Sequence, residues 1–254
     1  MADLSGWQIA ATSAALFLGA TLQTSSGFGF ALLALPLLGW IGVPGPLAIT
    51  MSLAAMMLQG FWLLSRSPEP LRLRENAGNA AATVVTSVAG VVLLSLIWGT
   101  RPRLLGQLIG VLVVASVAAA VLLRPPPRAK VGAAWTAAAM ALSGLLSGLS
   151  SIGGPPVALW AMAHDWSADR IRATIWLILL PRAPVLLVAL YVSFGDLVFD
   201  ALLLVLIGVP ALWLGSTLGS FAGIRLTAER LRPFATVILL LTGASAIVRP
   251  LLAA

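Results

Sequence analysis

Residues 147–156 read SGLSSIGGPP, and they interrupt an apolar run that extends from residue 132 to residue 163. Gly and paired Pro in the middle of such a run break a helix, because Pro has no backbone N–H to donate and Gly costs conformational entropy. Residues 23–29, QTSSGFG, interrupt a second apolar run, from residue 7 to residue 39, in the same way. Each run therefore predicts two half-helices joined by unwound backbone.

The composition around these breaks places the chain in a membrane. Of its 254 residues, 60% are apolar and 9% are charged, whereas a soluble domain is roughly 45–50% apolar and about 25% charged. Further stretches approach the roughly 20 apolar residues that a spanning helix needs, namely 46–64, 77–99, 104–123, 171–193, 197–222 and 231–248. The sequence thus predicts an all-α integral membrane protein with about eight hydrophobic segments.

Several classes of function are excluded by residue counts. The chain has no Cys and one His, His164, so thiolate metal sites and His clusters are absent. An intramembrane protease would need a membrane His, a pair of membrane Asp residues or a zinc motif, and the spans contain none of these. No catalytic residue, metal or cofactor is expected. The net charge of +7 favours basic cytoplasmic loops over nucleic-acid binding.

The two breaks belong to an internal repeat. Ser25–Gly29 aligns without a gap with Ser150–Gly154, 125 residues later. The same offset pairs Gly90 with Gly215 and the Arg-Pro dipeptide at 124 with that at 249. The pattern predicts two homologous halves, residues 1–125 and 126–254, which together form one transmembrane transporter domain.

Loop charge favours an inverted arrangement of these halves. If all eight segments crossed, 14 basic residues would divide 7 to 7 between the two sides, against the positive-inside tendency. If the two broken segments are re-entrant hairpins, 11 fall on one side: Arg66, Arg72, Arg74, Arg124, Arg128, Lys130, Arg170, Arg172, Arg225, Arg230 and Arg232. Each half then has one hairpin and three crossings, which makes the repeats inverted. Both termini are expected outside, and the bacterial inner membrane is the expected location.

The breaks are also the candidate binding site. The second half-helices are expected to begin near Phe28 and Pro155, and helix N-termini offer positive partial charge and N–H donors to an anion. An alternative is that the small residues only let helices pack closely; their occurrence in both halves favours a site. The candidate substrate-binding residues are Gln23, Thr24, Ser25, Ser26, Gly27, Phe28, Gly29, Ser147, Ser150, Ser151, Gly153, Gly154 and Pro155.

Arg182 completes this candidate site. It is the one charged residue well inside a hydrophobic segment, and Pro181 and Pro184 flank it. A buried guanidinium is costly, and an anionic substrate would neutralise it. The alternative is an Arg that extends to the membrane surface near a kink. Trp176 and Trp213 also fall within spans, where packing is the favoured interpretation.

The motifs TSSGFGFALLALPLL (Thr24–Leu38) and SGLSSIGGPPVAL (Ser147–Leu159) resemble those of the sulfite exporter TauE/SafE family of membrane permeases. The resemblance covers nearly the whole chain and implies movement of sulfite, of organosulfonates such as sulfoacetate, or of other anions. It further implies that Ser25–Gly29 and Ser150–Pro156 are the transport motifs. Phe28 stands opposite Gly153, a departure from strict equivalence of the two motifs.

The predicted function is a secondary permease for a small anion, which works by alternating access between two broken helices. A passive anion channel is the main alternative, and a non-transport membrane assembly protein is a further one. The expected partners are a small sulfonate, sulfite or carboxylate anion and the lipid bilayer. Coupling to a proton and formation of a homo-oligomer are both compatible with the sequence.

Overall fold

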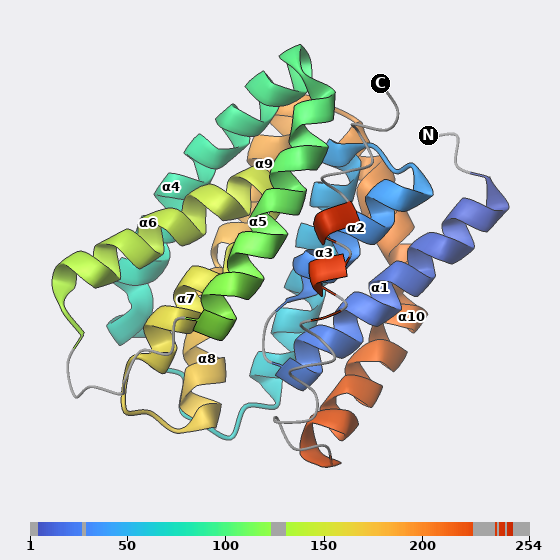
Figure 1. The fold of residues 1–254 in the computed structure, drawn as a ribbon. Helices are drawn as coiled ribbons and strands as arrows, with labels where there is room; N and C mark the ends of the chain where they lie inside the picture. Colours follow the sequence, from blue (N-terminus) through green and yellow to red (C-terminus); the bar gives the residue numbers. More distant parts are fainter. Residues whose placement is uncertain are drawn as a thin grey trace.

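Helices are the only regular elements in the part of the chain that the computed structural model describes, as predicted (Figure 1). That part comprises residues 5–26, 29–122 and 131–225, with the helical positions 237, 239–241 and 243–245. The helices are α1 (Gly6–Ser26), α2 (Phe30–Ile41), α3 (Gly45–Ser65), α4 (Leu73–Thr100), α5 (Pro102–Leu122), α6 (Ala133–Ser150), α7 (Gly154–Met162), α8 (Ala168–Leu179), α9 (Arg182–Phe194) and α10 (Leu197–Arg225).

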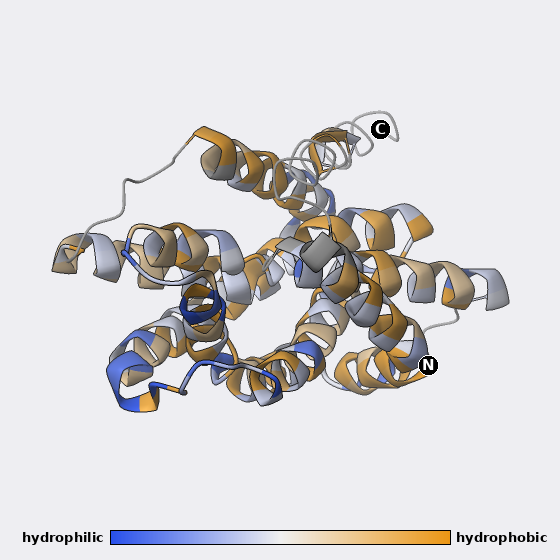
Figure 2. Cartoon of the chain, turned by 90° about the horizontal axis from the view of Figure 1, so that it is seen from below, coloured by the Kyte–Doolittle hydropathy of each residue, from blue (hydrophilic) through white to orange (hydrophobic). Residues whose placement is uncertain are grey.

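Within the described residues, five helical stretches are long and apolar enough to cross a bilayer. They are Gly45–Ser65, Leu73–Thr100, Ala133–Ser150, Ala168–Phe194 and Leu197–Phe221. Their outward faces carry large apolar side chains, such as Val85 at 71% and Val192 at 79% exposure. Hydrophobic residues follow the helices, and hydrophilic ones gather in connections and helix ends (Figure 2). This distribution suits a lipid solvent and identifies an integral membrane protein.

Each of the two broken segments folds back as a hairpin. Gln8 Nε2, in the first turn of α1, donates to the carbonyl oxygen of Ile41, the last residue of α2, at 3.1 Å. Trp160 Nε1, near the end of α7, donates to Thr136 Oγ1, in the first turn of α6, at 2.9 Å. The chain therefore enters and leaves each hairpin at the same end of the molecule.

Each hairpin packs against a long helix that is distant in the sequence: α6 against α4, and α1 against α10. A Cβ added at Gly90 of α4 would meet the carbonyl oxygen of Leu145 in α6. A Cβ added at Gly215 of α10 would likewise meet the carbonyl oxygen of Phe17 in α1. Because only glycine allows backbones to approach this closely, these residues position α6 on α4 and α1 on α10.

The charged connections α3–α4 and α7–α8 lie at one end of the molecule (Figure 1). Ser167 Oγ donates to Glu69 Oε1 at 2.9 Å, and Arg170 Nη2 lies 3.7 Å from Glu75 Oε2. The α4–α5 connection lies at the opposite end (Figure 1). Arg66 and Arg72 of the α3–α4 connection and Arg170 and Arg172 at the start of α8 therefore share one end.

The segment predicted at 171–193 falls within one candidate span, Ala168–Phe194. Within it, helix α8 ends at Leu179, and α9 begins at Arg182. Pro181 has no N–H to continue the helical hydrogen bonds, which explains the interruption. Helix α3 has no such break. The predicted segment 231–248 lies mostly outside the described residues.

Candidate functional site

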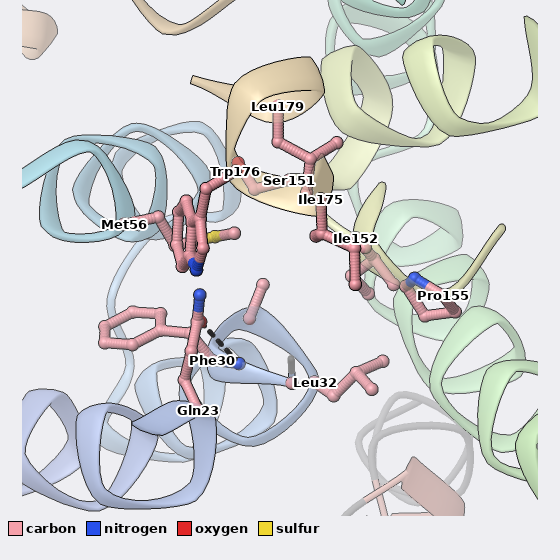
Figure 3. Close-up of a pocket in the computed structure, with 13 residues that line it drawn as sticks. Gln23, Phe30, Leu32, Met56, Ser151, Ile152, Pro155, Ile175, Trp176 and Leu179 are labelled. Atoms are coloured by element: carbon pink, nitrogen blue, oxygen red, sulfur yellow. Dashed lines mark hydrogen bonds between the residues drawn. The ribbon is translucent and has the colours of Figure 1, made fainter. Parts of the chain in front are cut away.

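The two helix breaks face one small cavity (Figure 3). Its free space is about 10 Å³, close to what a single water molecule requires. The lining residues come from both breaks and from α3 and α8: Gln23, Gly29, Phe30, Ala31, Leu32, Met56, Ser151, Ile152, Gly154, Pro155, Ile175, Trp176 and Leu179. The cavity is thus narrow and lined by mostly apolar side chains.

The first break presents its polar side chain to the cavity. Gln23 is 2% exposed, and its Oε1 accepts a hydrogen bond of 3.0 Å from the backbone N–H of Phe30, the first residue of α2. The amide nitrogen points the other way, toward the indole of Trp176 (Figure 3). Gly29 adopts a left-handed φ of 114°, which a residue without Cβ tolerates and which starts α2 at this angle.

The second break is tied to the surrounding helices. Ser151 has a left-handed φ of 56°, and its Oγ donates to the carbonyl oxygen of Ile49 in α3 at 3.0 Å. Ser143 Oγ donates to the carbonyl oxygen of Gly153 at 2.6 Å. Both hydroxyl protons therefore bond to backbone, and they hold the turn between α6 and α7 in place.

The N-termini of α2 and α7 differ in their supply of donors. The first four N–H groups of a helix lack partners within it. In α7 two of these four positions are Pro155 and Pro156, which have no N–H. In α2 all four positions, from Gly29 to Leu32, carry an N–H, and all four residues line the cavity. The N–H of Phe30 is taken by Gln23 Oε1, which leaves those of Gly29, Ala31 and Leu32 at the α2 end. The α2 end therefore has more N–H groups to offer an anion.

Five of the sequence-predicted site residues line the cavity: Gln23, Gly29, Ser151, Gly154 and Pro155. Six others do not: Thr24, Ser25, Ser147, Ser150, Gly153 and Arg182. The four hydroxyls in this second group donate to carbonyl oxygens of their own helices at 2.5–2.9 Å. Gly27, Phe28 and the side chain of Ser26 lie outside the described residues.

The sequence interpretation missed the apolar part of the lining. Trp176, interpreted as a packing residue, is 4% exposed and lines the cavity with Met56 and Leu179. Nothing in composition separates these residues from apolar ones that face lipid, because both environments favour the same side chains. The one local signal is Pro181, which marks α8 as half of another interrupted helix.

Arg182 is the first residue of α9 and is 1% exposed. Among the described residues, nothing accepts a hydrogen bond from its Nε or Nη1. It lies outside the cavity lining, three positions along the chain after the lining residue Leu179. Its charge is therefore buried without a described carboxylate partner, a costly arrangement that an anion would relieve.

Interrupted helices that meet at a cavity within an apolar bundle are typical of membrane transporters. A family model, sulfite exporter TauE/SafE, matches residues 12–246, and the chain belongs to this family. The protein is thus a membrane transporter of the sulfite and anion exporter type. No curated protein and no solved structure matched the chain.

Proposed function

We propose that this chain is a secondary permease that moves a small anion, sulfite or an organosulfonate, by alternating access at the cavity between the two hairpins. One observation carries the proposal: the N-termini of α2 and α7, from separate hairpins, open on the same cavity. Helix N-termini attract anions through their partial charge and their N–H groups. The described lining contains no Asp or Glu that would repel an anion.

Two further observations support an anion carrier. The positive charge of Arg182 is buried near α8, where low polarity extends its influence. The free space of the cavity is also too small for sulfite in this form. A narrow site between the helix breaks suits a carrier, whereas a conducting channel requires a continuous path.

We include in this proposal two inverted halves, residues 1–125 and 126–254, with both termini outside the bacterial inner membrane. Helix α2 begins at Phe30 and α7 at Gly154, 124 residues later; α4 begins at Leu73 and α10 at Leu197, again 124 later. Figure 1 supports the inversion, since α1 descends where α6 ascends.

The chain has no native Cys, so single-Cys variants test this topology directly. Exposed Ser65→Cys and Asp165→Cys should react with an impermeant maleimide from the same face of oriented vesicles, and Thr100→Cys from the other face. Labelling of Ser65→Cys and Asp165→Cys from opposite faces would contradict the hairpin arrangement.

The transport proposal is tested with purified protein in liposomes. Sulfite uptake should saturate with concentration, and sulfite preloaded inside should accelerate it, because a carrier returns faster when loaded. Uptake that stays linear with concentration and shows no acceleration would identify a channel. Absence of flux and of binding for sulfite, methanesulfonate, sulfoacetate and acetate would favour an assembly role. Flux measured with and without a pH gradient tests proton coupling.

A further inference from the structure

Two hydrogen-bond donors face each other across the cavity without an acceptor between them. The amide nitrogen of Gln23 points toward the indole nitrogen of Trp176 (Figure 3). Their side chains are almost fully buried, at 2% and 4% exposure. Among the described residues, neither nitrogen donates to a protein acceptor at hydrogen-bond distance. Both nitrogens therefore offer an unused donor to a ligand in the cavity that accepts.

The orientation of the Gln23 amide is fixed by its neighbour. The backbone N–H of Phe30 can only donate, and it lies 3.0 Å from Oε1 of Gln23. A flipped amide would set an NH₂ group against this N–H, which removes the bond and leaves two donors in contact. The NH₂ group must therefore point away from α2 and toward Trp176.

The orientation of the Trp176 indole is fixed by its contact with Gly60. A Cβ added at Gly60 of α3 would lie 2.7 Å from both Cε3 and Cζ3 of the ring. The benzene edge of the indole thus rests against Gly60, and Nε1 lies on the opposite edge of the ring. An indole nitrogen donates and cannot accept. The two nitrogens, Gln23 Nε2 and Trp176 Nε1, consequently offer donors only.

We propose that Gln23 and Trp176 form a donor pair that selects a fully ionised oxyanion, whose oxygen accepts from both nitrogens. This inference rests on the proposed transport function and names the residues that determine its specificity. A ligand oxygen that carries a proton would bring a third donor to the pair and bind more weakly. An ammonium group would find no carboxylate in the described lining, so the pair also disfavours amino sulfonates.

The test measures binding to the full-length protein in detergent, with sulfite as the probe. Trp176→Phe keeps an aromatic ring and removes one donor, so sulfite affinity should fall at least roughly tenfold, the size of one hydrogen bond to a charged group. Trp213→Phe is the matched control, since Trp213 is 57% exposed on α10, and its affinity should be unchanged. Gln23→Glu keeps an oxygen for the Phe30 N–H but replaces the donor with a negative charge, and it should abolish binding.

A second variant tests whether the position of the Trp176 ring matters when both donors are retained. Gly60→Ala retains both donors but pushes the Trp176 ring off its support, so sulfite affinity should fall severalfold. Gly39→Ala serves as its control, because a Cβ at Gly39 meets nothing within 4 Å. Methanesulfonate should also bind more tightly than aminomethanesulfonate, which differs by the ammonium group.

A spectroscopic readout covers variants that fail to fold. In protein labelled with ¹⁵N-tryptophan, sulfite should move the indole N–H resonance of Trp176 downfield, as a new hydrogen bond to an anion does. If sulfite binds and this resonance does not move, or if Trp176→Phe binds sulfite as tightly as the parent protein, the donor pair is wrong while the transport proposal stands. If none of the oxyanions binds the parent protein, both proposals fall.

Discussion

The break between α1 and α2 and the break between α6 and α7 share Ser, Gly and a constant spacing, but their side chains have different partners. At the first break, Gln23 holds the end of α2 and keeps its amide protons free for the cavity. At the second, Ser143 and Ser151 donate their protons to backbone carbonyls. Two similar sequences thus have different roles. The first break presents hydrogen-bond donors to the cavity, and the second fixes the geometry of the turn between α6 and α7.

The largest expected effect is on transport, and it separates the two breaks. Gln23→Leu removes both the cap on Phe30 and the donor in the cavity, so sulfite flux should fall by roughly a hundredfold or more, as expected for two lost hydrogen bonds. Ser151→Ala removes a proton that already bonds to Ile49, so flux should fall only severalfold. The sulfite flux of both variants is measured in liposomes and divided by the amount of folded protein. Equal losses would mean that the two breaks contribute alike to binding.

A smaller effect concerns the free energy of unfolding. Here we expect the second break to be more sensitive to substitution than the first. A Cβ at Gly153 would lie 2.5 Å from the carbonyl oxygen of Ser143 and also strike Ser147, so Gly153→Ala should destabilise by about 3 kcal/mol through overpacking. At Gly29 a Cβ makes ordinary contact with Leu22, and Gly29→Ala should cost only ~1–2 kcal/mol for its left-handed backbone. Thermal unfolding in detergent compares them. A less stable Gly29→Ala variant would show that the first break is the more tightly packed.

The smallest effect is expected at Ser25 and Ser150, which align with each other in the two motifs. Ser25 and Ser150 each donate to a carbonyl of their own helix, at 2.9 Å in both cases. Because such bonds add little to a helix, Ser25→Ala and Ser150→Ala should each change stability by less than about 0.5 kcal/mol and leave sulfite affinity unchanged. A tenfold loss of affinity in either variant would mean that these hydroxyls turn toward the substrate in another state of the transporter.

The sequence was sufficient to predict the membrane class, both helix breaks and the start of α7, because Pro and Gly act locally on the backbone. It also named Gln23, Ser151 and Gly154, which line the cavity. It could not assign the hydroxyls of Ser25 and Ser150, since a Ser in a helix bonds either to a ligand or to the preceding turn, and only the fold decides. It favoured packing for Trp176, because the position of this ring depends on Gly60, more than a hundred positions earlier in the chain.

The pairing of α1 with the distant helix α10 bears on how the protein is made. Helix α1 leaves the ribosome long before its glycine-matched partner α10. The face of α1 around Phe17 therefore lacks this partner until Gly215 has been made. The first hairpin reaches its final packing only after α10 has been inserted, so a chain shortened before α10 would leave this early part of the transporter incomplete.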